Sequence, residues 1–314
     1  MRPETSVASA IVSMHSRYDL ERALSQAAIS LRLVTRRVPP FALVLGGVTS
    51  VQVGAALART MFDDLGPSGT SLLRVAFAAL ALVLVFRPDP RRYTWNELRY
   101  AVAFGLALGF MNLSFYLGLD RLDLGVAVTI EFVGPLGVAV FLSRRRLDLV
   151  WAALAAVGIV LLANPGGADS VDTLGLVFVL IAGGCWAAYI LIAQRAGRVF
   201  PGSHGVAMAM VIATLIPIAP GIAEAGSSLL DPALLAMGAA VGVLSSAIPY
   251  SLETEALRRI PAHVFGVLMS MEPAVAALAG FVVLGQDLGL REIVAIGFVV
   301  AASAGVSIAT PPEA

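Results

Sequence analysis

The sequence contains no lysine, and all 21 of its basic residues are arginine. A Walker A loop and a pyridoxal Schiff base each require a lysine, so P-loop ATP hydrolysis and that cofactor chemistry are excluded within this chain. The single cysteine, Cys185, allows neither an intrachain disulfide nor a metal site built from cysteines. We therefore expect no bound cofactor, and any work that the protein does must draw on a gradient or on a partner.

Histidine is also scarce, and His15, His204 and His263 do not form the HExxH pattern of zinc-dependent membrane proteases. The chain has no GxSxG nucleophile elbow and no intramembrane pair of aspartates. Acidic and basic residues balance to a formal net charge of +0, which gives no support to a nucleic-acid partner. The sequence therefore predicts a protein that is not an enzyme.

Charged residues make up only 13% of the chain and hydrophobic residues 58%, with a mean hydropathy of +0.87. These values lie outside the range of soluble proteins and inside the range of proteins that cross a bilayer several times. After Pro40 the apolar residues form runs long enough to span a membrane as helices. The ten runs lie at 41–58, 67–86, 99–119, 124–142, 148–163, 173–194, 204–224, 232–252, 263–284 and 290–309. The predicted fold is an all-α integral membrane protein with ten transmembrane helices in a lipid bilayer.

Residues 1–38 differ from the rest of the chain because they hold six arginines and no long apolar run. This segment can form neither a transmembrane span nor a signal peptide with an apolar core. We expect a basic cytoplasmic extension. Its apolar residues recur at helical spacing, which fits a helix on an anionic leaflet, and a disordered tail is the alternative.

The arginines divide unevenly between the two ends of the predicted spans. Seventeen fall on the side of the amino terminus, and Arg59, Arg121 and Arg291 fall on the opposite side. Because arginine-rich loops remain in the cytoplasm, both termini are predicted to be cytoplasmic in the plasma (inner) membrane. The remaining arginine, Arg74, lies within the second run.

One apolar run, Leu124 to Leu142, carries Glu131 near its centre. In a helix this glutamate lies about 3 Å from the bilayer midplane. A charge at that depth costs roughly 2.5 to 3.5 kcal/mol on insertion scales, so it normally faces a bundle interior or a wet cavity. Pro135 lacks the amide proton that would bond to the carbonyl of Glu131, so one residue offers both a carboxylate and a free backbone acceptor.

The same pattern returns downstream, where residues 257–273 align without a gap on residues 119–135. Pro273 falls on Pro135, and Glu272 lies beside Pro273 in the middle of its own span. A duplication accounts for both copies. Five spans per copy force the second copy to enter the membrane from the opposite face, which predicts inverted repeats with a substrate site between them at mid-membrane. The predicted repeats are 39–163 and 173–309.

Other polar and aromatic residues within the runs are candidates for lining that site, because polar groups at such depth need partners. Arg74 requires an acid, and its pairing with Glu131 or Glu272 would leave the other glutamate to bind a proton or a substrate ammonium. Trp186 and Tyr189 either form a substrate wall or fill the core. The predicted substrate and coupling residues are Glu131, Arg74, Glu272, Asn112, Tyr116, Tyr250, Trp186, Tyr189 and Gln52, with Pro135, Pro273 and Pro249 as helix-breaking residues.

Four segments in order resemble the drug/metabolite transporter superfamily of EamA type, and its threonine/homoserine exporter branch in particular. They are IEFVGP (130–135), GGCWAAYILIAQRAG (183–197), LSSAIPYSLETEAL (244–257) and FGVLMSMEPAVAAL (265–278). The resemblance covers about residues 41–309. It implies a ten-helix inner-membrane exporter with cytoplasmic termini, driven by the proton gradient. The extension before Pro39 departs from the compact start of the family.

The function expected from these features is proton-coupled export of small amino acids such as threonine and homoserine by alternating access. Members of one fold transport different compounds, so export of another amphipathic metabolite or drug is the alternative. A channel, a lipid flippase and a partner-binding membrane scaffold are further alternatives. Electrogenic flux without gradient coupling would favour the channel.

Overall fold

The computed structural model describes residues 38–142, 147–163, 171–201, 204–249, 252, 256, 259–260, 265 and 268–309. The predicted cytoplasmic extension, apart from Val38, and the candidate Tyr250 therefore lie outside the described residues. All regular structure within the described residues is helical.

The first part of the chain forms helices that follow one another with short connections. They are α2 (Pro40–Arg59), α3 (Phe62–Phe86), the 3₁₀ turn η1 (Pro90–Arg92), α4 (Trp95–Leu119), α5 (Leu124–Glu131), α6 (Val133–Leu142) and α7 (Leu147–Ala163).

The second part continues in the same way. Its described elements are α8 (Thr173–Val199), α9 (His204–Ala225), the 3₁₀ turn η2 (Gly226–Leu230), α10 (Pro232–Gly242), the π-helical turn η3 (Val243–Ala247), α13 (Glu272–Leu284) and α14 (Leu290–Ala309). Every predicted apolar run overlaps one of the helices of the two parts.

Five helices are long and apolar enough to cross a membrane, by length and composition. They are Pro40–Arg59, Phe62–Phe86, Trp95–Leu119, Thr173–Val199 and His204–Leu230. Shorter apolar helices accompany them, among them Glu272–Leu284. The prediction of an all-helical membrane protein is confirmed.

Two helices begin four or five residues earlier than their apolar runs. α4 starts at Trp95 because Thr94 and Glu97 form a capping box, in which the Thr94 amide donates to Glu97 Oε2 at 2.7 Å. α3 starts at Phe62 and bends at Gly66, the residue before Pro67. The φ of Gly66 is 67°, a value that glycine adopts without strain. The predicted starts at residues 99 and 67 were therefore late, because hydropathy alone does not detect a polar cap or a bend.

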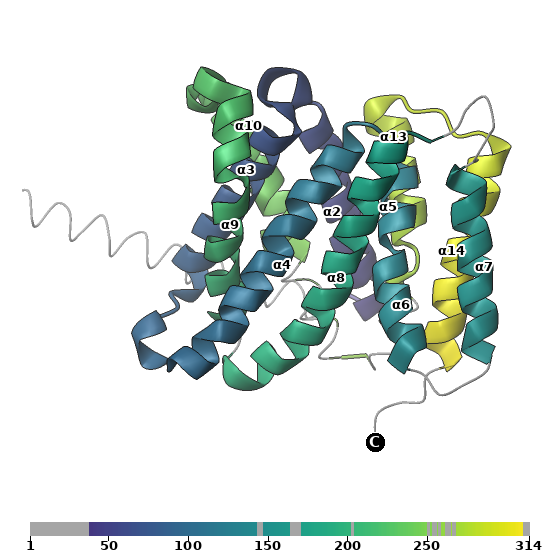
Figure 1. Ribbon diagram of the computed structural model, residues 1–314, viewed down its shortest axis with the longest axis horizontal. Helices are drawn as coiled ribbons and strands as arrows, with labels where there is room; N and C mark the ends of the chain where they lie inside the picture. Colours follow the sequence, from purple (N-terminus) through teal and green to yellow (C-terminus); the bar gives the residue numbers. More distant parts are fainter. Residues whose placement is uncertain are drawn as a thin grey trace, which may run out of the picture.

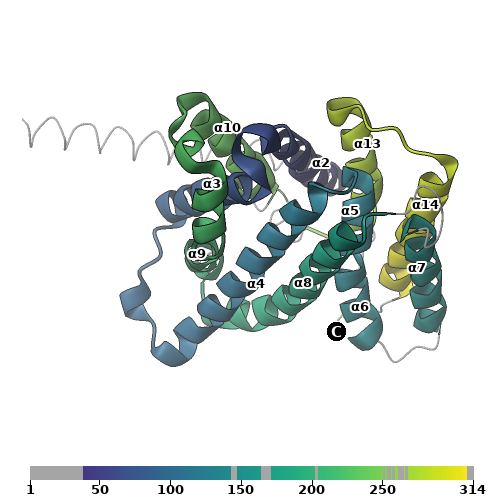
Figure 2. The same ribbon diagram turned by 45° about the horizontal axis from the view of Figure 1, so that its top comes forward.

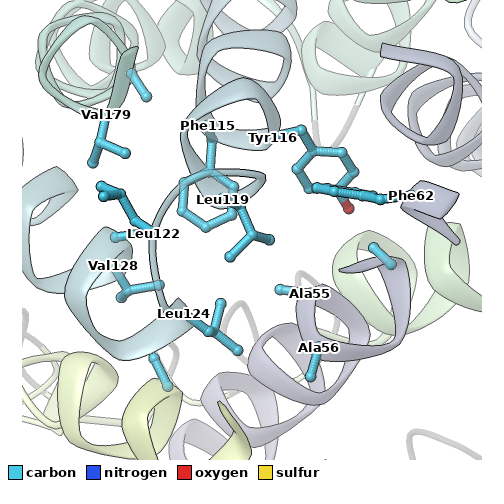
Figure 3. Close-up of a cluster of buried hydrophobic side chains, with 14 of the residues drawn as sticks. Ala55, Ala56, Phe62, Phe115, Tyr116, Leu119, Leu122, Leu124, Val128 and Val179 are labelled. Atoms are coloured by element: carbon cyan, nitrogen blue, oxygen red, sulfur yellow. The ribbon is translucent and has the colours of Figure 1, made fainter. Parts of the chain in front are cut away.

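The helices form one bundle, in which helices of the first part of the chain pack beside helices of the second part (Figures 1 and 2). α3 packs along α9, α4 lies between α8 and α9, and α14 packs along α7. The short helix α5 is surrounded by α8 and α13, and all eight of its residues are buried. Its Leu124 and Val128 belong to the apolar cluster in Figure 3, together with Ala55 and Ala56 of α2 and Phe115 and Leu119 of α4.

Candidate functional site

The apolar run around Glu131 is broken at its centre. α5 ends at Glu131, Phe132 forms a turn, and α6 begins at Val133. The Phe132 amide still donates to the carbonyl of Val128 at 3.0 Å, but Pro135 offers no proton to the carbonyl of Glu131. The backbone acceptor freed by the proline therefore belongs to the residue that carries the carboxylate.

A second break lies in the other half of the chain. Ser270 and Met271 form a turn, and α13 begins at Glu272 with Pro273 in its first turn. The Met271 amide donates to the carbonyl of Leu268 at 3.2 Å. The offset that takes Pro135 to Pro273 also takes Phe132 to Ser270, so the two breaks lie at equivalent positions under the predicted repeat alignment.

The two breaks border one cavity of about 120 Å³ in the middle of the bundle. Seven of the predicted substrate and coupling residues line it, and Pro249 lines it as well. The seven come from α2, α3, α4, α5, α8 and α13, which are far apart in the sequence. They are Gln52, Arg74, Asn112, Glu131, Trp186, Tyr189 and Glu272.

The charged groups of the cavity act on one another. Glu131 and Glu272 are buried, with 7% and 6% of their surface exposed. Glu131 lies near enough to Glu272 and to Arg74 for both charges to act on it. The Arg74 guanidinium itself lies over the Tyr116 ring, with its Cζ 5.4 Å from the ring centroid. This cation–π contact stabilises a partly buried positive charge at the cavity wall.

The neutral polar groups differ in how firmly they are held. Gln52 donates from Nε2 to Glu272 Oε1 at 3.0 Å, which fixes one carboxylate oxygen of the second break. Asn112 donates from Nδ2 to the carbonyl of Leu108 in its own helix at 2.8 Å. Ser245 also lines the cavity, and its buried Oγ has no hydrogen-bond partner among the described residues.

Both aromatic candidates line the cavity and also pack against the core. Trp186 meets Phe132 edge to face, with ring centroids 5.6 Å apart, and Tyr189 stacks on Phe104 at 5.6 Å. The two alternatives considered for Trp186 and Tyr189, wall and core filling, are therefore compatible. Tyr116 is fully buried beneath Arg74 and contributes to the site through that guanidinium.

Sequence reasoning missed the close approach of α8 to the first break. A Cβ on Gly183 would lie 2.8 Å from the carbonyl oxygen of Glu131, and a Cβ on Gly134 would collide with the carbonyl of Gly183. Only glycine at both positions lets the two backbones come this near. The apolar lining residues Val51, Ala55, Met111, Phe115, Val128 and Met269 also carried no signal, because apolar side chains are common in every span.

Comparison with known proteins gives relatives over most of the chain. The profile described as the EamA-like transporter family matches residues 173–308. The threonine/homoserine exporter RhtA of Salmonella typhimurium strain LT2 is 43% identical over 279 residues, covering 86% of this chain and 93% of that protein. The exporter of the same name from Escherichia coli K12 is 42% identical over 286 residues, covering 88% and 95%.

A solved crystal structure with 18% sequence identity superposes with a TM-score of 0.58 and covers 84% of this chain and 95% of its own. At that identity the similarity concerns the fold alone. The identity to the two exporters is much higher and extends over nearly their full length. This chain is therefore a membrane transporter and not an enzyme, and it belongs to the EamA-like transporter family.

Proposed function

We propose that this protein exports small zwitterionic amino acids, threonine and homoserine first, across the plasma membrane as a proton-coupled secondary transporter. The observation that carries the proposal is the central cavity, where Arg74, Glu131 and Glu272 face one small space. A dehydrated amino acid must pair both its ammonium and its carboxylate, and this cavity offers a group of each sign. The relatives named as threonine/homoserine exporters support the same substrate class.

The size of the cavity separates this proposal from its main alternative, export of a drug or a larger amphipathic metabolite. Pockets for drug-sized ligands occupy about 300 to 1,000 Å³. The central cavity has about 120 Å³. A flat apolar drug would also bring no group that pairs with Arg74, although it would displace water from that guanidinium. Both features favour a small polar substrate.

The proposed architecture is a pair of inverted five-helix repeats, 39–163 and 173–309, that open the central site to each side of the membrane in turn. The equivalent positions of the two breaks support it, as does the match of the family profile to residues 173–308. Both termini are placed in the cytoplasm on the arginine distribution. An enzyme reporter fused after Ala314 tests this orientation, because activity of the reporter outside the cell would contradict it.

Glu131 is the proposed coupling acid, with Arg74 as the group that modulates its proton affinity. The Glu131 carboxylate forms no hydrogen bond with the described residues and lines the cavity. It also ends α5, where the helix dipole opposes a negative charge. Approach of Arg74 would then favour release of a proton from Glu131, and withdrawal of Arg74 would favour uptake of a proton by Glu131.

The direct test is growth of an overexpressing strain on inhibitory levels of single amino acids, combined with efflux measured on preloaded cells. Resistance and faster efflux for threonine and homoserine are expected, relative to a strain that carries the Glu131→Gln variant at equal membrane abundance. Resistance to apolar drugs without any amino-acid efflux would replace the proposal with its alternative. Flux that follows membrane potential without a pH gradient would favour a channel.

A further inference from the structure

A second cavity, of about 510 Å³, lies at the ends of the helices on the arginine-poor face. Arg59, Arg121 and Arg291, which are all the arginines assigned to that face, line it together. Carboxylates from several elements surround them, and we call the whole the charged pocket. Its acidic residues are Asp120, Asp123, Asp172, Asp287 and Glu292.

Two ion pairs at the rim of the charged pocket are loose. Arg59 Nη2 lies 3.8 Å from Asp120 Oδ1, and Arg121 Nη1 lies 3.8 Å from Asp172 Oδ1. The paired side chains are between 29% and 44% exposed. Pairs of this length and exposure contribute little to stability, so a structural latch is a poor explanation for them. Arg59 also donates from Nη2 to the Asp120 carbonyl at 3.5 Å and lies over the Phe62 ring, with its Cζ 4.8 Å from the ring centroid. A ligand carboxylate would compete with the long contacts to Asp120.

Asp123 is an acid of the charged pocket whose side chain has neither a hydrogen bond nor a salt bridge with the described residues. It is the residue before α5, but its side chain does not cap the helix, and the Leu124 amide donates instead to Gln286 Oε1 at 3.1 Å. Burial and the nearby charge of Glu292 raise the pKa of Asp123, against the opposing effect of Arg59. A bound ammonium would offset that repulsion.

The charged pocket and the central cavity are joined by α5. Asp123 precedes its first residue and Glu131 is its last, so the backbones of these two residues are about 12 Å apart along the helix axis. Four members of the apolar cluster in Figure 3 line the two cavities: Val128 and Phe115 line the central cavity, and Leu119 and Leu122 line the charged pocket. The two cavities therefore border the same apolar cluster.

We propose that the charged pocket is a second binding site for zwitterionic amino acids, on the side where the substrate is released. Arg59 receives the carboxylate and Asp123 receives the ammonium. The substrate class rests on the proposed function, to which this inference adds a second binding position. The volume of the pocket accommodates a hydrated amino acid, whereas the smaller central cavity requires a dehydrated one.

The test uses a reporter thiol in the pocket of the purified full chain in detergent, where both faces are accessible. Val171→Cys, in a Cys185→Ser background, places the thiol in the pocket without removing a charge. We expect threonine and homoserine to slow its reaction with a charged maleimide. Threoninol, which lacks the carboxylate, and 3-hydroxybutyrate, which lacks the ammonium, should protect it much less.

Asp123→Asn should raise the half-protecting concentration about tenfold, as expected for the loss of one charged partner. Asp64→Asn is the matched control, because Asp64 is an exposed carboxylate in the first turn of α3 that does not line the pocket. It should leave protection unchanged. If the Val171→Cys protein does not accumulate, Asp287→Cys gives an exposed thiol in the same pocket.

Protection must persist when Glu131→Gln is added, because the pocket does not use the central glutamate. This keeps the inference separate from the proposed function, which is tested by efflux from the unmodified protein. A reactive thiol that no zwitterion protects would overturn the inference. So would equal protection in the Asp123→Asn and Asp64→Asn proteins, or protection that disappears with Glu131→Gln.

Discussion

The two helix breaks have the same backbone plan but hold their glutamates differently. Glu131 is the last residue of α5, whereas Glu272 is the first residue of α13. The dipole of a helix favours a negative charge at its beginning and opposes one at its end. Gln52 also donates a hydrogen bond to Glu272 at 3.0 Å, while the Glu131 carboxylate has no such donor among the described residues.

In the proposed duplication the two copies supply equivalent positions, and the packing around the two glutamates makes these positions unequal. Glu272 is oriented by the hydrogen bond from Gln52 and lies at the end of a helix where the dipole favours a negative charge. The environment of Glu131 leaves its charge open to the presence of Arg74, of Glu272 and of a substrate. We therefore assign proton coupling to the first break and substrate orientation to the second.

The largest effect is expected from Glu131→Gln. Glutamine keeps the size and hydrogen-bonding capacity of the side chain but cannot titrate, so uptake driven by a pH gradient into everted vesicles should fall to the level of empty vesicles. Exchange of substrate at equal concentrations on both sides should remain. If the Glu131→Gln protein, present at normal membrane abundance, still accumulates substrate under a pH gradient, the two breaks do not differ in the proposed way.

Gly134→Ala tests the packing that holds the first break. Its Cβ would collide with the carbonyl of Gly183, so we expect a loss of stability of about 1 to 3 kcal/mol and lower membrane abundance. Gly137→Ala is the control in the same helix, because its Cβ meets nothing within 4 Å. That change should be neutral or stabilising by about 1 kcal/mol or less. Thermal unfolding in detergent measures the stability of both variants. Equal unfolding midpoints for the two variants would contradict the close approach of Gly134 to Gly183.

Glu272→Gln should reduce transport less than Glu131→Gln does. An amide at position 272 can still accept the hydrogen bond from Gln52, so the orientation survives although the charge is lost. We expect less than a tenfold fall in the initial rate at low substrate, which corresponds to about 1.4 kcal/mol. The gradient should still drive accumulation. Complete loss of gradient coupling in this variant, with Glu131→Gln active, would reverse the assignment.

The smallest effect is expected from deletion of residues 1–36. Both breaks, the cavity and the charged pocket are built from residues after Pro39. Export per molecule in the membrane should therefore be unchanged, as measured by efflux normalised to abundance. Lost export at normal abundance would make this segment part of the transport machinery, whereas lost abundance alone would assign it a role in insertion.

The sequence alone determined which residues lie at mid-membrane depth. Depth follows from the position of a residue within its apolar run, and the cost of burying a charge there marks Arg74, Glu131 and Glu272. The repeat offset then predicted that Pro135 and Pro273 occupy equivalent places. Gln52, Asn112, Trp186 and Tyr189 were identified by the same argument, and the structure brings all of them to one cavity.

Tertiary structure alone decided how these residues meet. Depth is a single coordinate, and it does not say which face of one helix meets which face of another. Three contacts depend on which helix faces meet. They are the hydrogen bond from Gln52 to Glu272, the position of Arg74 over Tyr116 and the contact of Gly134 with Gly183. The charged pocket likewise joins residues at or beside helix ends that are far apart in the sequence, because only the packing of the helix ends brings Arg59, Asp123 and Glu292 together.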